Sequence, residues 1–323
     1  MSKDKAAQNR ADVYTRITAE IIAAIEAGAG EWRAPWHHDG ASTARPQNVV
    51  SGRRYRGVNT LALWGAAMAH GYVDGLWGTY RQWQESGAQV RKGEQATTVV
   101  LWKQINPRNR DDFEEDEDRR ARLFARAFSV FNVAQVDGYE PSPAIMLAEA
   151  ERLAHAETFI GNLGIKTIFG GARAYYQPST DTVFMPPFDK FRDAASFYGV
   201  WIHENGHASG AKHRLDRDLS GPFGSAAYAA EECCAEILSG MILADQGIAH
   251  HPRPDHAAYI SSWLEVLKQD SKAIFAAASK AQQAADWMHA QQPQNDARLG
   301  AQAGTPTSRE LEIAGMDDVG KGE

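Results

Sequence analysis

Two histidines, His203 and His207, stand four positions apart, and Glu204 directly follows the first of them. On a helix, side chains at positions i and i+4 lie on one face, one turn apart, so both imidazoles can reach one ion at about 2.0–2.1 Å. Glu204 would face a water molecule at that ion and could accept its proton. The spacing predicts a helical metal site of the zincin type, with Glu204 as the acid/base carboxylate.

Such a site needs a third protein ligand. Glu232 is followed four residues later by Glu236, so on a helix Glu232 could bind the metal while Glu236 orients a ligating histidine. His213 completes a literal His-Glu-x-x-His-x-x-Gly-x-x-His pattern, but the Met-containing turn that belongs to that pattern has no clear counterpart. Glu231 could be the buried ligand instead. The residues favour Glu232 and leave His213 and Glu231 open.

The metal is predicted from the same donor set. Imidazole and carboxylate ligands suit Zn²⁺ first, and Mn²⁺ or another divalent ion is also admissible. Two histidines, one glutamate and an open position fit a catalytic site better than a closed structural one. The chemistry is that of a zinc-dependent metallopeptidase of the gluzincin-like type, and the sequence leaves open whether hydrolysis takes place.

Residues 31–110 are basic and aromatic, although the whole chain has a net charge of −7. They carry 11 Lys and Arg against 5 Asp and Glu, and they hold six of the nine tryptophans. Binding of single-stranded DNA needs cations along the phosphate path and exposed rings on which bases stack. The alternative is a core of tryptophans with a solvated rim of arginines. The candidate DNA contacts are Arg53, Arg54, Tyr55, Arg56, Trp77, Tyr80, Arg81, Trp83, Arg91, Lys92 and Lys103.

Hydrophobic periodicity and turn residues predict an α+β fold in two domains. An α+β domain over residues 1–137 contains helices at 11–28, 57–70 and 79–86, and a hairpin of strands at 97–102 and 124–133 around an exposed loop at 106–120. A linker at 138–143 leads to a mainly helical domain over 144–290, with helices at 144–162, 189–211, 225–245 and 255–290 and short strands at 174–176 and 182–185. The polar tail 291–323 is expected to be disordered.

The chain is expected to be cytoplasmic and to have no membrane partner. Its two cysteines, Cys233 and Cys234, are adjacent and therefore unsuited to bridging each other, and no apolar run reaches the roughly 18 residues of a membrane span. The polar N-terminus lacks the apolar run of a secretory signal.

Two groups of motifs point to a known family. The first comprises residues 55–59 (Tyr-Arg-Gly-Val-Asn), 77–82 (Trp-Gly-Thr-Tyr-Arg-Gln) and 87–94 (Gly-Ala-Gln-Val-Arg-Lys-Gly-Glu). The second comprises Tyr175-Tyr176, Asp181, Met185-Pro186, the 203–207 motif, Arg214-Leu215, Tyr228-Ala229, Glu231-Glu232 and Ala235-Glu236. Together they resemble the ArdC-type antirestriction proteins of conjugative plasmids, a family similar to the N-terminal part of TraC-type plasmid primases. The resemblance covers most of residues 11–290.

This resemblance implies an N-terminal single-stranded-DNA-binding domain followed by a zincin-like metallopeptidase domain. It also implies protection of incoming plasmid DNA from host restriction during conjugation, and it favours Glu232 over His213 as the third ligand. Single-stranded DNA is then the expected partner, together with a host restriction enzyme or another host protein. The competing hypotheses are a zinc metallopeptidase that cleaves a host protein and a scaffold domain with a structural metal.

Overall fold

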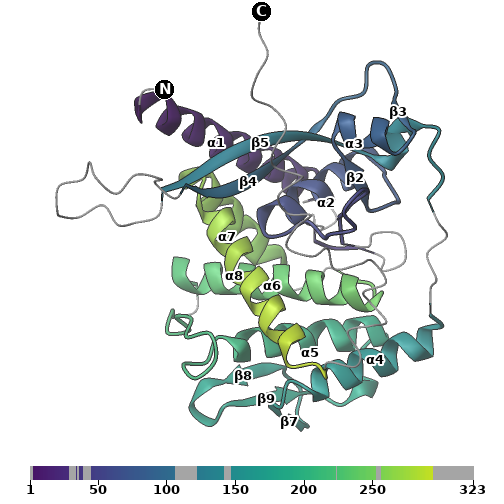
Figure 1. Cartoon of the computed structure of the whole chain (residues 1–323). Coiled ribbons are helices and arrows are strands. Elements are labelled where there is room, and N and C mark those ends of the chain that lie inside the picture. The colour runs from purple at the N-terminus through teal and green to yellow at the C-terminus, as the bar shows by residue number, and fades with distance from the viewer. Residues whose placement is uncertain are drawn as a thin grey trace, which may run out of the picture.

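The structure is a computed structural model that describes residues 3–28, 34, 36–38, 45–105, 122–141, 147–222, 224–251 and 256–293. The predicted loop 106–120, part of the linker 138–143 and most of the tail 291–323 lie outside the described residues. The fold is α+β, as predicted from the sequence. In Figure 1 the N-terminal helices and the long hairpin lie at one end and a small sheet lies at the other.

In the described residues of the N-terminal part, three helices combine with two sheets. The helices are α1 (Lys3–Gly28), α2 (Val58–His70) and α3 (Tyr80–Glu85). The larger sheet has the order β1-β2-β5-β4, and β3 pairs with β6. The strands are β1 (Gln47–Asn48), β2 (Leu76–Gly78), β3 (Gln89–Val90), β4 (Thr97–Ile105), β5 (Arg122–Asn132) and β6 (Val136–Asp137). The predicted hairpin is confirmed: β4 and β5 are antiparallel, with Thr97 opposite Val130.

The C-terminal part stacks helices over a three-stranded sheet of order β7-β9-β8. Its strands are β7 (Lys166–Phe169), β8 (Tyr175–Gln177) and β9 (Thr182–Met185). Its helices are α4 (Glu149–Gly161), α5 (Ala194–Ser209), α6 (Ala226–Gln246), α7 (His256–Gln269) and α8 (Ala273–Ala290). Helix α5 packs on one side against β8 and β9 and on the other against α6 (Figure 1).

Three predictions about these elements were wrong or incomplete. The predicted helix 255–290 is two helices, because the side chain of Asp270 accepts a hydrogen bond from the Lys272 backbone N–H (2.8 Å) and forms a turn between them. Helix α5 begins at Ala194 rather than at residue 189, because Asp193 caps it by accepting from the Ser196 N–H (2.7 Å). Strand β7 was not predicted; it is short and largely exposed, so it lacks an alternating apolar pattern.

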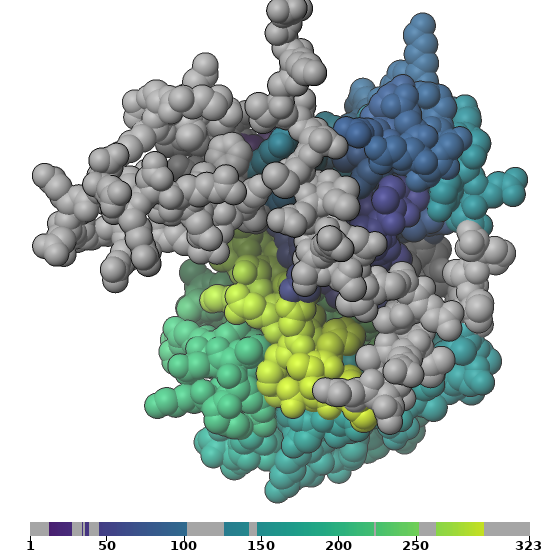
Figure 2. Space-filling view, viewed as in Figure 1, coloured from purple at the N-terminus to yellow at the C-terminus, as the bar shows by residue number. Residues whose placement is uncertain are grey.

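The two predicted domains share one hydrophobic core. Ile17, Ile21 and Ile25 of α1 and Trp36 belong to the same buried cluster as the apolar side chains of α5, α6, α7 and α8. In Figure 2 the yellow helix α8 lies between the N-terminal part, in blue and purple, and the teal and green part, which comes after the N-terminal part in the sequence. Smaller clusters around Trp77 and around Trp83 lie beside the N-terminal sheets. The boundary at residue 137 therefore stays a prediction, because packing continues across it.

Helix α6 lies at the centre of this core and is buried around most of its circumference. Every residue from Glu231 to Ala244 is buried, including both cysteines, which are free thiols. Burial raises the pKa of Cys233 well above its ordinary value and that of Cys234 to about 12, so both stay protonated and act as small apolar groups. Among the described residues, no helix has both the length and the apolar content needed to cross a membrane.

A buried ion cluster joins the N-terminal segment to the end of α6. Asp245 lies 3.1 Å from Arg45 Nη1, 2.5 Å from Arg54 Nη1 and 2.9 Å from His289 Nε2. Burial alone would raise the pKa of Asp245, but the two guanidinium groups and the His289 hydrogen bond outweigh it and lower that pKa to about 2. A second pair across the same contact, Arg56 with Asp286, is largely exposed.

We expect Asp245→Asn to reduce the free energy of unfolding by about 3 kcal/mol, because it leaves two arginines without their shared carboxylate. The matched substitution Asp286→Asn at the exposed pair should reduce it by less than about 1 kcal/mol. Both are measured by denaturant unfolding at pH 7.

The same experiment has a pH signature. The folded-state pKa of Asp245 lies below its ordinary value of 3.8, so its contribution is complete above about pH 4 and is lost as the pH falls towards 2. The difference between wild type and Asp245→Asn should shrink over that window. Equal losses from the two substitutions at pH 7 would contradict the role given to the buried cluster.

Candidate metal centre

The two helices that carry the site approach each other closely at one glycine. A Cβ on Gly206 of α5 would lie 3.1 Å from Leu238 Cδ2 and 3.5 Å from the Ala235 Cβ, both on α6. The absence of a side chain there lets the backbones come together, so that the polar face of α5 meets Glu232 and Glu236. Apolar side chains of α5, among them Trp201 and Ile202, fix the rotation of the helix by burial in the core.

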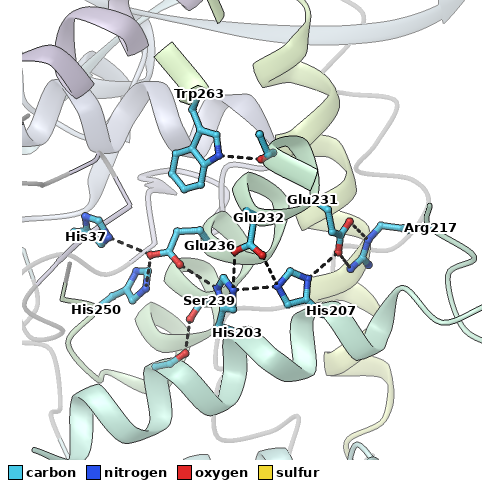
Figure 3. Close-up of polar contacts among 12 residues, drawn as sticks. His37, His203, His207, Arg217, Glu231, Glu232, Glu236, Ser239, His250 and Trp263 are labelled. Atoms are coloured by element: carbon cyan, nitrogen blue, oxygen red, sulfur yellow. Dashed lines mark hydrogen bonds and ion pairs between the residues drawn. The ribbon is translucent and has the colours of Figure 1, made fainter. Parts of the chain in front are cut away.

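Three of the predicted ligands meet at this contact, as Figure 3 shows. His203 Nε2 and His207 Nε2 lie 3.1 Å apart. One oxygen of the Glu232 carboxylate, Oε2, lies 3.4 Å from His203 Nε2, and the other, Oε1, lies 3.4 Å from His207 Nε2. Ligands at about 2.0–2.1 Å in tetrahedral arrangement around one ion are separated from each other by about 3.3 Å. The donor set therefore has the composition and the spacing that a divalent metal requires.

A separate carboxylate orients each histidine. His203 Nδ1 lies 3.1 Å from Glu236 Oε2, and His207 Nδ1 lies 3.3 Å from Glu231 Oε1. A carboxylate accepts, so each Nδ1 carries a proton, and each Nε2 is directed towards the other and towards Glu232, where its lone pair can be offered to a metal. Three potential metal donors then face one another in a buried site, an arrangement that a cation among them would stabilise.

Glu231 is held in turn by Arg217. The guanidinium donates to both oxygens of Glu231, from Nη2 (2.7 Å) and Nε (3.0 Å), and Nη2 also donates to the Gly206 carbonyl (2.7 Å). Arg217 thus neutralises Glu231 and fixes the end of α5 at the same time. Glu231 was predicted only as an alternative ligand, and Arg217 was not predicted, because its position in the chain carries no spacing signal.

The charge balance of the site is strongly negative. Burial would lower the pKa of His207, but the hydrogen bonds to Glu231 and Glu232 and the charge of Glu204 outweigh it and raise that pKa to about 10. Burial would raise the pKa of Glu232, yet the two histidines hold it well below its usual range. A positive charge at this position is therefore favoured, and a divalent cation would supply it.

Glu204 faces a cavity at the metal donors. The cavity has a volume of about 930 Å³, and its wall includes Tyr176, Lys190 and Tyr228 besides the histidines. Glu204 makes no hydrogen bond or ion pair with any described residue. Its carboxylate is therefore available to a water molecule or to a substrate that enters the cavity.

The other proposed third ligand, His213, is not part of this group. Its side chain is 63% exposed, and Nε2 lies 3.3 Å from Asp181 Oδ2. Asp181 is itself held by both terminal nitrogens of Arg214 (2.7 and 2.8 Å) and by the Tyr176 hydroxyl (2.8 Å). The chain leaves α5 at Gly210, which carries His213 away from the donors.

Comparison with known proteins accounts for both parts of the chain. Residues 11–131 match the N-terminal domain of the anti-restriction factor ArdC, and residues 154–280 match a zincin-like metallopeptidase domain. The chain also resembles the metal-free crystal structure of the antirestriction ArdC protein from plasmid R388, with a TM-score of 0.70 and 36% identity over 87% of this chain and 97% of that one. The chain belongs to the ArdC antirestriction family.

Three further relatives match most of this chain. The Mn(II)-bound structure of the R388 ArdC protein matches with a TM-score of 0.68 at 35% identity, over 86% of this chain and 97% of that one. Protein y4eC of Sinorhizobium fredii is 60% identical over 90% of this chain and 96% of its own length. The Escherichia coli DNA primase TraC is 36% identical over 85% of this chain, which spans only 27% of that primase.

The predicted DNA contacts of the ArdC-type N-terminal part fall into separate groups. Trp77 and Trp83 were predicted as stacking rings, and this is wrong for the present conformation, because they are 1% and 0% exposed in two core clusters.

Arg54 and Arg56, two more of the predicted DNA contacts, form ion pairs with carboxylates of α6 and α8. Arg53 is exposed, Tyr55 is half-buried, and Arg81 pairs with Glu85 on α3. The side chain of Lys103 lies outside the described residues.

The remaining three predicted contacts lie together. Tyr80, Arg91 and Lys92 line one surface depression beside Gln89, whose Nε2 donates to the Tyr80 hydroxyl (2.8 Å). Arg91 is held by Glu94 (2.9 Å), and Lys92 is exposed and forms no ion pair with any described residue. Among the described residues, this depression groups two of the predicted cations with an exposed ring.

We expect Glu232→Gln to weaken divalent-metal binding more than Glu231→Gln does. The first replaces an anionic metal donor by a neutral amide, and the second only weakens the hydrogen-bond acceptor behind His207, a kind of group whose mutation typically costs about 10–100-fold in affinity. Metal titration against a competing chelator measures both, and His213→Ala is the control that should bind as wild type does. A larger loss from Glu231→Gln than from Glu232→Gln would reverse the assignment of ligand and orienting group.

Proposed function

We propose that this protein binds single-stranded DNA and protects incoming plasmid DNA from host restriction during conjugation. Membership in the ArdC family along nearly the whole chain carries this proposal. The likeness to the TraC primases supports it, since those proteins are named as DNA enzymes. A location in the cytoplasm, where the entering strand and the restriction enzymes meet, follows from the same proposal.

The depression lined by Tyr80, Arg91 and Lys92 is the proposed entry to the DNA path. An exposed aromatic ring offers a face on which a base can stack, and a lysine beside it can contact a phosphate. Arg53 adds an exposed cation, whereas Arg54 and Arg56 are engaged by carboxylates of the C-terminal part. DNA would therefore use only part of the set predicted from the sequence.

We expect binding of a labelled single-stranded oligonucleotide to weaken steeply with salt, because phosphate contacts release counterions. Tyr80→Ala should cost about 1–3 kcal/mol of binding free energy through lost stacking. Lys92→Ala should lower the slope of log affinity against log salt by about 0.7.

Lys166→Ala is the matched control, because it removes one exposed lysine from β7 at the opposite end of the molecule. Equal and negligible affinity for single- and double-stranded oligonucleotides would rule out the proposed DNA binding. Identical effects of Lys92→Ala and Lys166→Ala would rule out the proposed path.

Peptide hydrolysis is the second candidate function, favoured by the cavity at Glu204. His203, His207 and Glu232 would hold the metal, with Zn²⁺ or Mn²⁺ as the proposed ion. A divalent ion held by these donors acts as a Lewis acid towards a carbonyl oxygen. Glu204 would take a proton from water and return it to the leaving amine, while Glu231 and Glu236 keep the histidines oriented. The proposed substrate is a segment of a host protein.

We expect Glu204→Gln to bind metal as wild type does and to protect DNA from restriction equally well, while any peptidase activity falls by about 10²–10⁴-fold. Antirestriction is measured as the yield of conjugation into a restricting recipient relative to a non-restricting one. Loss of protection by a variant that still binds metal would instead make hydrolysis the basis of antirestriction.

A further inference from the structure

A second group of buried histidines lies directly behind the metal donors. His37 Nε2 lies 3.1 Å and His250 Nε2 lies 3.2 Å from the same oxygen, Oε1, of Glu236. The other oxygen of Glu236 contacts His203 Nδ1 at 3.1 Å. All four side chains are at most 4% exposed, and Figure 3 shows them in a continuous row. One carboxylate thus connects a metal donor to two histidines from distant parts of the chain.

His37 reaches this position because its segment lies on α6 at a glycine. A Cβ added to Gly240 would lie 2.7 Å from the carbonyl oxygen of Trp36 and 3.0 Å from the Cβ of Trp36. His38 next to it exchanges backbone hydrogen bonds with His250, at 3.0 and 2.7 Å, and its Nε2 lies 2.9 Å from the Gly240 carbonyl. The N-terminal segment is therefore fixed against the same helix that carries Glu232 and Glu236.

The hydrogen-bond partners determine which nitrogen of His37 carries the proton. The backbone N–H of Ala34 donates to His37 Nδ1 (2.9 Å), so Nδ1 accepts and Nε2 carries the hydrogen that is donated to Glu236. In His250 the Trp36 carbonyl accepts from Nδ1 (3.0 Å), which places the proton of the neutral ring on that nitrogen, and Nε2 lies 3.2 Å from Glu236 without a proton to donate. Glu236 thus accepts from His37 Nε2 through one oxygen and from His203 Nδ1 through the other.

His37, Glu236 and His250 also satisfy the distance requirement for a second metal group. The hydrogen bonds argue against that use. A metal on His37 Nε2 would require the proton on Nδ1, where it would point at the N–H of Ala34. The arrangement therefore favours a hydrogen-bonded support over a second metal site.

We propose that His37 is a positioning residue of the metal centre: its hydrogen bond to Glu236 fixes His203, so that a segment of the N-terminal part completes the metal site of the C-terminal part. This inference rests on the proposed metal centre. Without His37, Glu236 loses a donor on Oε1 and can rotate away from His203 Nδ1. His203 then loses the partner that keeps Nε2 directed at the metal.

Metal binding by the full-length chain tests this proposal. Mn²⁺ and Zn²⁺ affinity and stoichiometry are measured by titration, and the absorption spectrum of the Co²⁺ form reports the geometry of the ligands. His37→Phe keeps a ring but removes the donor, and it should weaken metal binding about tenfold, the lower end of the usual effect of groups behind a ligand. It should also change the Co²⁺ spectrum. His37→Gln retains an N–H that can reach Glu236 and should restore most of the affinity.

His38→Phe is the matched control, since His38 is equally buried on the same segment but bonds the Gly240 carbonyl. It should lower the melting temperature of the metal-free protein as His37→Phe does, while leaving metal affinity and the Co²⁺ spectrum unchanged. Wild-type affinity in His37→Phe would overturn the proposal, as would equal affinity losses in His37→Phe and His38→Phe.

Stoichiometry separates the remaining outcomes. One ion per wild-type chain, retained at lower affinity in His37→Phe, supports the positioning role. Two ions per wild-type chain, one of them lost in His37→Phe, would make His37 a ligand and overturn it. Absence of metal binding by the wild type would contradict the proposed metal centre itself. This result is distinct from one that contradicts only the role of His37.

Discussion

Helix α6 buries four carboxylates, and this charge constrains everything packed around it. A buried carboxylate is tolerated only when cations or hydrogen-bond donors compensate for its lost hydration. Glu231 is compensated by Arg217 and His207, and Glu232 faces the two histidines of the candidate metal centre, where a cation would compensate its charge. Glu236 and Asp245 have partners from other regions of the chain. The positions of α5, of the segment that carries His37 and of the arginines at residues 45 and 54 are therefore tied to acids on α6.

The N-terminal part supplies several of these partners. His37 reaches Glu236, and Arg45 and Arg54 reach Asp245. Since α1 also contributes to the common hydrophobic core, the part that matches the ArdC N-terminal domain is joined to the zincin-like part by both apolar packing and buried charge. A single carboxylate, Glu236, therefore lies between His37 of the N-terminal part and His203 of the candidate metal centre.

The same arrangement separates metal binding from hydrolysis. Glu231 and Glu236 hold the histidines, and Glu232 would hold the ion, whereas Glu204 lines the cavity without a hydrogen-bond or ion-pair partner among the described residues. The groups behind the histidines would orient the ligands whether or not hydrolysis takes place. This is why family membership, rather than the His-Glu-x-x-His motif, carries the functional proposal.

The sequence alone determined the α+β class, most of the helices, the β4–β5 pairing and the motif residues, because periodicity, turns and i, i+4 spacing are local properties of a chain. It favoured Glu232 through its spacing to Glu236. Tertiary structure decided which acid faces which nitrogen, that Trp77 and Trp83 are core, and that Arg54 and Arg56 bind carboxylates of α6 and α8. It also brought His37 to a glutamate 199 positions away. Contacts across such separations depend on how helices pack, and close approaches at Gly206 and Gly240 leave no periodic pattern from which they could be predicted.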